Sequence, residues 1–267
     1  MNNHLIIIGG TSGIGLALAN WHLSQQWQAT VIGSNADKIA NLPQSLLQNP
    51  LFTAITCDIS DNIARGKLFD KLSQQPFNRL IYCAGKYYNE RQQNLSQDES
   101  QRMLAVNLQA FQAVFSWASD RLQTVESSDK HLIAIASVAG LLDFAHASLY
   151  AKCKRAMIAS CDAYRLGLQP FGIKVTCIAS GYIDTQTLRS LNNGDASHKP
   201  HLISEEQAVT EIVHAIRQNI ALHIFPKPMK RTISLLSMLP KPLLDKVMAL
   251  QYRHQDSQAK SSEVKPK

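Results

Sequence analysis

The chain has 267 residues, of which 45% are hydrophobic and 18% charged, and it contains 12 glycines and 10 prolines. This is the composition of a folded globular protein and excludes a disordered or collagen-like chain. The formal net charge of +7 is uneven, because residues 227–267 hold nine basic and three acidic side chains whereas residues 1–226 are close to neutral. A basic, nucleic-acid-binding body is therefore excluded.

The sequence predicts neither a membrane span nor a secreted protein. Two candidate uncharged stretches, residues 103–119 and 131–142, are interrupted by polar side chains such as Asn107 and Ser137, and no run of about 18 apolar residues exists. No Lys or Arg precedes Lys38, and the apolar run at residues 5–8 is too short for a signal-peptide core. We expect a cytoplasmic protein. Its five cysteines form no C-x-x-C pair, which favours reduced core residues and no metal site.

Short apolar runs alternate with helical patterns along the first 225 residues. Strands are predicted at residues 4–8, 29–32, 52–57, 80–83, 132–136 and 173–178. Their continuous apolar character is typical of strands buried on both faces of a parallel sheet. Helices are predicted to begin near Ile14, Ala36, Ile63, Ser100, Ser148 and Ser204. Ser204 and Gln207 have capping-box spacing. The order predicts an α/β fold, a single doubly wound domain with a central parallel sheet and helices on both faces.

The C-terminal region has a different texture. We predict a domain over residues 1–226 and a basic, proline-punctuated extension over residues 227–267, partly helical and with a disordered last dozen residues. One interpretation is an amphipathic basic helix on an anionic membrane. The other is a helix that covers the active-site mouth or a subunit partner, and the prolines and modest cation density favour it.

A glycine-rich turn, GGTSGIG at residues 9–15, follows the first predicted strand and opens the first helix. Glycine lets the backbone approach a ligand, and the free N–H groups of a helix N-terminus favour a pyrophosphate. An ordinary strand-to-helix turn is the alternative, but the position between strand and helix favours nucleotide binding. The spacing resembles the GxxxGxG turn of the classical short-chain dehydrogenase/reductase family. The resemblance implies cofactor contacts from Gly9, Thr11, Ser12, Gly13, Ile14 and Gly15.

Four polar residues resemble the catalytic tetrad of that family. Tyr150 and Lys154 are four residues apart, on one face of a helix, and such a pair alone is more often a surface pair. Ser137 lies 13 residues before Tyr150 at the end of a predicted strand, and Asn107 lies in a predicted helix. The alternatives are a strand-end hydroxyl that caps a loop for Ser137 and a helix-bending polar residue for Asn107.

The resemblance implies a role for each member of the tetrad. Tyr150 is the general acid or base, Lys154 contacts the nicotinamide ribose, Ser137 hydrogen-bonds the substrate oxygen, and Asn107 supports a water-mediated proton relay. A free phenol has a pKa of about 10. We expect the Lys154 ammonium, helped by the nicotinamide charge, to lower the pKa of Tyr150.

Further motifs follow in family order. Cys83-Ala84-Gly85 stands where the family usually has Asn-Ala-Gly, and Asp58-Ile59 occupies the place that borders the adenine. After the sixth strand, Gly181 and Thr185 match the family's Pro-Gly and Thr, with Ser180 in place of the proline. The resemblance implies nicotinamide contacts from Ile183 and Thr185, and cofactor contacts from Cys83, Ala84, Gly85, Tyr150, Lys154 and Gly181.

The choice between NAD and NADP normally depends on the end of the second strand, where a carboxylate holds the ribose hydroxyls or a cation pairs with the 2′-phosphate. Here Ser34 and Asn35 provide neither. Both can hydrogen-bond a phosphate or a hydroxyl, and without a carboxylate the main repulsion against a phosphate is gone. NADP is therefore favoured over NAD. Lys38 can reach the phosphate, although a solvated helix lysine is the more common case.

The resemblance implies a Rossmann-type oxidoreductase that transfers hydride between NAD(P) and a small carbonyl or alcohol substrate, packed as a homodimer or homotetramer and without a nucleic-acid partner. The alternative is a non-catalytic NAD(P)-binding regulator or scaffold with the same fold. Residues 182–202, with a turn over residues 192–195, are expected to select the substrate. Phe144 and His146 are candidates for the pocket wall, although a histidine such as His146 is more often a surface residue. The residues do not select a substrate class.

Overall fold

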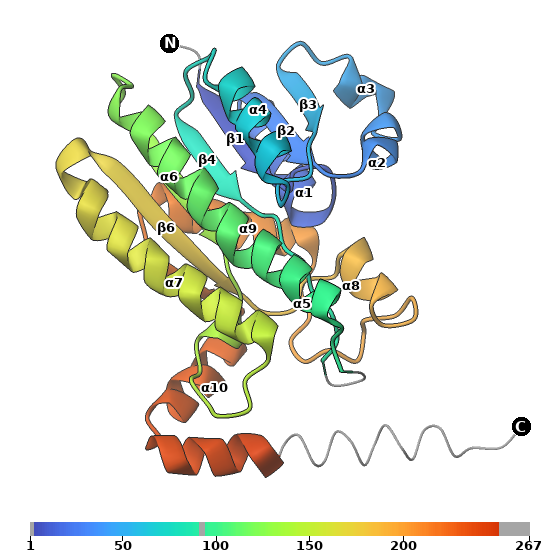
Figure 1. Cartoon of the computed structure of the whole chain (residues 1–267), viewed down its shortest axis with the longest axis vertical. Coiled ribbons are helices and arrows are strands. Elements are labelled where there is room, and N and C mark those ends of the chain that lie inside the picture. The colour runs from blue at the N-terminus through green and yellow to red at the C-terminus, as the bar shows by residue number, and fades with distance from the viewer. Residues whose placement is uncertain (1–2, 91–93, 251–267) are drawn as a thin grey trace, which may run out of the picture.

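The computed structural model describes residues 3–90 and 94–250 (Figure 1). Seven parallel strands form one sheet in the order β3-β2-β1-β4-β5-β6-β7. They are β1 (His4–Ile8), β2 (Gln28–Gly33), β3 (Phe52–Thr56), β4 (Arg79–Tyr82), β5 (Lys130–Ile135), β6 (Ile173–Ser180) and β7 (Leu222–Phe225). The predicted doubly wound α/β fold is confirmed, because the order reverses between β1 and β4 and helices cover the sheet.

The α-helices of the described residues are α1 (Gly13–Ser24), α2 (Ala36–Ala40), α3 (Gln44–Leu47), α4 (Asn62–Leu72), α5 (Gln97–Leu104), α6 (Ala110–Gln123), α7 (Leu149–Leu168), α8 (Gln186–Ser190), α9 (Glu205–Arg217) and α10 (Lys227–Ser237). A π-helical turn (Ala105–Gln109) joins α5 to α6, and a 3-10 turn (Val138–Gly140) follows β5. The capping box predicted at the start of α9 is present.

Strand β1 shows why the predicted strands are continuously apolar. Ile6 and Ile8 belong to a core cluster on one face of the sheet, with Phe111 of α6 and Met157 of α7. Leu5 and Ile7 belong to the cluster on the other face, with residues of α1 and α9. Because neighbouring residues of a strand point to opposite faces, a strand covered by helices on both faces needs apolar side chains throughout.

Several elements differ from the prediction, among them α3 and α8, for which no helix was predicted. Strand β7 was not predicted, and its physical character explains why: it is an edge strand of four residues, three of which are only partly buried. The helix predicted near Ser100 begins at Gln97, behind a capping box formed by Ser96 and Glu99. Asn107, expected in a regular helix, lies in the π-helical turn.

The C-terminal segment packs at one end of the molecule, where Figure 1 shows α10 and the helical residues 241–250 below α7. Met229 of α10 lies against Gly181, and Leu244 is only 5% exposed. Part of the C-terminal segment therefore packs against the α/β domain. In the part of the chain that the structure describes, no helix has the length and apolar character needed to cross a membrane. The last dozen residues, predicted to be disordered, lie outside the described residues.

Candidate active site

The glycine turn after β1 brings three segments into close contact. A Cβ on Gly9, whose φ is 85°, would lie 2.6 Å from the backbone nitrogen of Ala84, and one on Gly15 would lie 2.2 Å from the Gly9 oxygen. Both distances are shorter than real Cβ contacts, so these positions require glycine. The turn consequently brings the start of α1 against the end of β1 and against residues 83–85.

The start of α1 is a candidate anion site. Ser12 occupies the N-cap position, but its side chain accepts no hydrogen bond from an amide of α1. A helix N-terminus carries a partial positive charge and unpaired N–H groups, which suit a phosphate. Gly13 lies next to Thr185, with 3.4 Å between an added Cβ and Thr185 Cγ2. The segment after β6 therefore also lies beside the start of α1.

The end of β2 presents two exposed polar residues, Ser34 and Asn35. Asn35 caps α2, because its Oδ1 accepts a hydrogen bond from the amide of Lys38 at 2.8 Å. The buried Thr11 packs against Gly33, where any Cβ would lie 2.3 Å from Thr11 Oγ1. The glycine turn and the end of β2 therefore lie in direct contact at the carboxyl-terminal edge of the sheet. Lys38 itself is exposed on α2.

Asp58, predicted to border the adenine, has a structural role in the protein. Its Oδ1 accepts hydrogen bonds from the amide and hydroxyl of Ser60, and its Oδ2 forms an ion pair of 2.6 Å with Arg102 of α5. Burial raises the pKa of this carboxyl, but the bonds from Ser60 and Arg102 outweigh it and hold the pKa below its ordinary value. The neighbouring Ile59 is buried. Both residues follow β3, at the edge of the sheet where the parallel strands β1, β2 and β3 end.

Asn107 connects the π-helical turn to the loop after β4. Its Nδ2 donates to the carbonyls of Lys86 and Met103, at 2.6 and 2.9 Å, and its Oδ1 accepts from the Lys86 amide at 3.3 Å. A Cβ on Gly85 would lie 3.4 Å from Asn107 Oδ1 and 3.8 Å from Lys154 Nζ. Asn107 and Lys154 therefore flank Gly85. The bond from Asn107 to the Met103 carbonyl within an irregular turn agrees with the helix-bending alternative, and the same turn places its side chain across Gly85 from Lys154.

Lys154 is buried in the protein interior, with 2% of its surface exposed. Its Nζ donates to the carbonyl oxygen of Ile135 at 3.0 Å and lies 5.7 Å from the centre of the Tyr150 ring. Burial lowers the pKa of Lys154 to about 8, because the ammonium loses its hydration. The group is still mainly protonated at pH 7.

Ser137 and Tyr150 meet through their hydroxyl groups. Ser137 Oγ accepts a hydrogen bond from the Ala139 amide at 3.2 Å, so it does cap a turn, as the alternative interpretation held. It also interacts with the Tyr150 hydroxyl. Burial raises the pKa of Tyr150 to about 12, and the interaction with Ser137 opposes that increase. In the protein alone the pKa of Tyr150 is therefore raised, because loss of hydration dominates. The expected lowering by Lys154 together with the nicotinamide charge stays a prediction for the nucleotide complex.

Two residues that the sequence analysis missed hold Tyr150 in place. The carboxylate of Glu90 accepts hydrogen bonds from the amides of Leu149 and Tyr150, at 2.9 and 3.3 Å. The ring of Tyr87 packs edge-on against that of Tyr150, with 5.2 Å between centroids. Both come from the loop after β4, about 60 residues away. No local sequence pattern marks them, since their role depends on where that loop lies.

Cys83 occupies the position at which the family usually has asparagine. Its sulfur accepts a hydrogen bond from the amide of Gly15, and burial raises the pKa of the thiol to about 11. The thiol is therefore neutral at physiological pH and serves as an acceptor for the first turn of α1. It lies close to Lys154, whose charge slightly opposes the increase in pKa.

The segment after β6 contains the remaining predicted site residues. Ile183 is 5% exposed, and Thr185 caps α8 by accepting from the Leu188 amide at 3.1 Å. Ser180, in place of the family's proline, is buried. Of the two candidates for the pocket wall, which lie between Ser137 and Tyr150 in the sequence, Phe144 is buried and His146 is exposed. His146 is therefore a surface residue.

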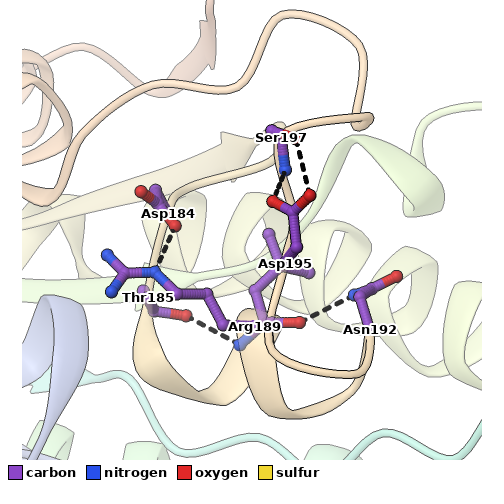
Figure 2. A network of polar contacts seen from close by, with 7 residues as sticks. Asp184, Thr185, Arg189, Asn192, Asp195 and Ser197 are labelled. Carbon is purple, nitrogen blue, oxygen red and sulfur yellow. Dashed lines mark hydrogen bonds and ion pairs between the residues drawn. The ribbon is translucent and has the colours of Figure 1, made fainter.

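A polar network shapes the loop that follows α8, as Figure 2 shows. Arg189 Nε pairs with Asp184 Oδ1 at 2.7 Å, and Asp195 accepts two hydrogen bonds from Ser197. Asn193 and Gly194 have positive φ angles of 54° and 92°, so the predicted turn over residues 192–195 is present. The network ties this loop to the residues beside Thr185.

Comparisons with known proteins agree with this arrangement. Residues 3–196 match the family model described as short chain dehydrogenase. An uncharacterised oxidoreductase of Staphylococcus aureus strain N315 is 27% identical over 193 residues, which cover 71% of this chain and 82% of that protein.

Solved structures share the fold. A short-chain dehydrogenase from Sphingobium yanoikuyae in complex with NADPH superposes with a TM-score of 0.74 at 17% identity, over 90% of this chain and 97% of the other. A 4-hydroxyisoleucine dehydrogenase complexed with NADH gives a TM-score of 0.68 at 22% identity, over 84% and 97%. The resemblance drawn from the motifs is confirmed by the family match over most of the chain. The chain belongs to the short-chain dehydrogenase family.

Proposed function

We propose that the protein is an NAD(P)-dependent oxidoreductase that reduces a carbonyl or oxidises an alcohol, with Tyr150 as the general acid or base. The observation that carries this proposal is the convergence of Ser137, Tyr150, Lys154 and Asn107 beside the glycine turn. The turn supports nucleotide binding, because glycine is required at Gly9 and Gly15 and the side chain of the N-cap residue Ser12 accepts no hydrogen bond from α1.

The residues fit a proton transfer on the reacting oxygen. Tyr150 holds its proton at neutral pH, which is the form that can donate to a carbonyl oxygen. Ser137 lies within hydrogen-bond reach of the same hydroxyl, so both groups can contact one substrate oxygen. A bound nicotinamide supplies or accepts the hydride on the carbon. Lys154, mainly protonated, stabilises negative charge on the Tyr150 oxygen as the proton leaves.

Asn107 has a positioning role beside Ser137, Tyr150 and Lys154. Its hydrogen bonds to Lys86 and Met103 fix the loop after β4 beside Lys154. This supports the water-mediated relay that the family resemblance implies, since an amide held in place can orient a water next to the ammonium.

For the cofactor we propose NADP in preference to NAD. Ser34 and Asn35 are exposed at the end of β2 and carry no charge that would repel a 2′-phosphate. Relatives solved with NADPH and with NADH both occur among the matching structures, so the preference depends on this chain's own residues.

The test is a titration of the purified protein with NADPH and with NADH, followed by nicotinamide fluorescence, and then addition of a panel of carbonyl compounds while absorbance is recorded. Tighter NADPH binding followed by oxidation is expected. Binding without oxidation across the panel would favour the regulator, and binding of neither nucleotide in either redox state would remove the basis of the proposal.

We also propose a cytoplasmic homo-oligomer packed through the helices that carry Asn107 and Tyr150. All five cysteines are free, which suits a reducing compartment. Light scattering coupled to size-exclusion chromatography checks the oligomer: a monomer at micromolar concentration contradicts it.

A further inference from the structure

The C-terminal segment of residues 227–250 has two faces, only one of which packs on the protein. Met229, Ile233 and Leu236 of α10 are partly buried and lie at helical spacing toward the body. Met229 contacts Gly181 directly. In the helical residues 241–250, Leu244 is buried and Asp245 is bonded to Ala145. The segment is therefore fixed to the protein by one side.

The opposite face of α10 carries cations and exposed apolar side chains in one stripe. Lys227, Arg231, Leu235 and Met238 recur at intervals of four, four and three residues, which places them on one side of a helix. Leu235 is 66% and Met238 74% exposed. No acidic residue occurs in α10, so the cations of this stripe have no partner on their own helix.

The following helical residues repeat the pattern. Leu243 and Leu250, 47% and 57% exposed, lie seven residues apart, with the exposed Lys246 between them on the same side. Lys241 is paired with Asp143 at 3.3 Å. Lys227, Lys230, Arg231 and Lys246 form no ion pair with another described residue. Of the nine large apolar side chains exposed in the described chain, four fall within residues 235–250.

We call the exposed sides of these two helices together the outer face; its residues are Lys227, Arg231, Leu235, Met238, Leu243, Lys246 and Leu250. Exposed apolar side chains next to unpaired cations are complementary to the surface of an anionic lipid bilayer, where the apolar groups enter the headgroup boundary and the cations meet lipid phosphates. A second copy of the chain would bring the same cations against each other. We propose that the outer face docks the protein on anionic lipid membranes as a peripheral protein.

A helix that covers the protein and a helix that rests on a membrane, the two interpretations that the sequence left open, are compatible here. One face of the segment packs on the protein while the other remains exposed. The inner side of the same segment contacts the surroundings of the proposed site, since Met229 lies on Gly181 and Asp245 holds the loop between Ser137 and Tyr150. The docking itself does not depend on the proposed chemistry.

The test is co-sedimentation of the full-length protein with phosphatidylcholine vesicles, with and without phosphatidylglycerol. Binding to the anionic vesicles only, and its loss at high salt, is the expected result. Lys227→Gln is expected to weaken binding about fivefold, the effect of one cation near a charged bilayer. Lys67→Gln, which removes an exposed cation of α4, is the control and should leave binding unchanged.

A second pair of variants tests the apolar part. Met238→Ser should weaken binding several-fold, whereas Ile63→Ser, at a position of matched exposure (73% against 74%), should not. Both variants are expected to retain the nucleotide binding and thermal unfolding of the wild type, which separates loss of docking from loss of fold.

Absence of binding to anionic vesicles by the wild type would overturn the proposal, as would equal losses in the variant and control of either pair. Self-association in lipid-free buffer that Met238→Ser abolishes would assign the face to a second copy instead. Vesicle binding without any turnover of a carbonyl would leave the docking intact and contradict only the proposed enzymatic function.

Discussion

The carboxylate of Asp245 accepts a hydrogen bond from the backbone amide of Ala145 at 2.7 Å, across 100 residues of sequence. Ala145 lies in the loop between Ser137 and Tyr150, next to the buried Phe144. The C-terminal segment therefore positions a loop that borders the proposed site.

Asp245→Ala should loosen that loop and raise the KM for the carbonyl substrate with little change in kcat. A hydrogen bond to a charged, partly exposed group contributes about 1 kcal/mol, or roughly fivefold. Steady-state kinetics check the result. Asp70→Ala, which removes an exposed carboxylate of α4, is the control, and an equal KM in the two variants would show that the loop does not need the bond.

Tyr150→Phe should lower turnover by about 10²- to 10⁴-fold, the usual contribution of a general acid or base. The phenyl ring keeps the packing against Tyr87, so nucleotide binding should remain close to that of the wild type. Stopped-flow reduction and a fluorescence titration measure the two properties. Tyr164→Phe on the same helix serves as the control, and full activity of the Tyr150 variant would exclude the proposed role.

Lys154 makes stability depend on pH. Burial lowers its pKa from 10.5 to about 8, so above pH 8 the folded protein loses this proton before the unfolded chain does. The contribution of Lys154 is most unfavourable below pH 8 and is relieved as the pH rises toward 10.5. Relative to Lys154→Met, the wild type should gain about 2 to 3 kcal/mol between pH 7 and pH 10.

Urea unfolding of both proteins at the two pH values measures this change. Subtracting the free energy of unfolding of Lys154→Met from that of the wild type removes the contributions of Tyr150 and of the buried thiols, because these groups titrate at high pH in both proteins. Lys152→Met, at an exposed position of the same helix, is the matched control and should follow the wild type. A pH-independent difference for Lys154→Met would mean that its ammonium is hydrated in the folded protein.

Gly15→Ala should destabilise the protein by about 1 to 3 kcal/mol, because the added methyl would overlap the backbone oxygen of Gly9 at 2.2 Å. It should also weaken nucleotide binding, since the start of α1 would have to move. Gly66→Ala in α4 is the contrasting variant: no atom lies within 4 Å of its added Cβ, and we expect it to gain up to about 1 kcal/mol. Similar unfolding midpoints for the two variants would contradict the close approach.

Ser34→Asp should reverse the preference between nucleotides. A carboxylate at the end of β2 can bind ribose hydroxyls and repels a 2′-phosphate. NADPH binding is expected to weaken about tenfold or more, while NADH binding is retained or improved. Fluorescence titrations give both dissociation constants. Ser34→Asn is the uncharged control, and an unchanged NADPH affinity in the Asp variant would place the phosphate elsewhere.

The local pattern of the chain was sufficient for most of the fold. Continuous apolar runs predicted six strands, because a strand buried on both faces must be apolar throughout. The same reasoning failed for β7, an edge strand with partly buried residues. It also failed to distinguish a regular helix from the π-helical turn at Asn107, because the turn follows from contacts with the loop after β4.

The sequence by itself determined which residues are available for the site: the required glycines at residues 9–15, the Tyr150 and Lys154 spacing, and the position of Ser137. These depend on backbone conformation and neighbours in the chain, which are local properties. The tertiary structure decided the charge states, since burial raises the pKa of Tyr150 and lowers that of Lys154. It also decided the supporting contacts from Glu90 and Asp245. Desolvation and long-range hydrogen bonds depend on segments that meet only when the chain folds, and no spacing along the sequence encodes them.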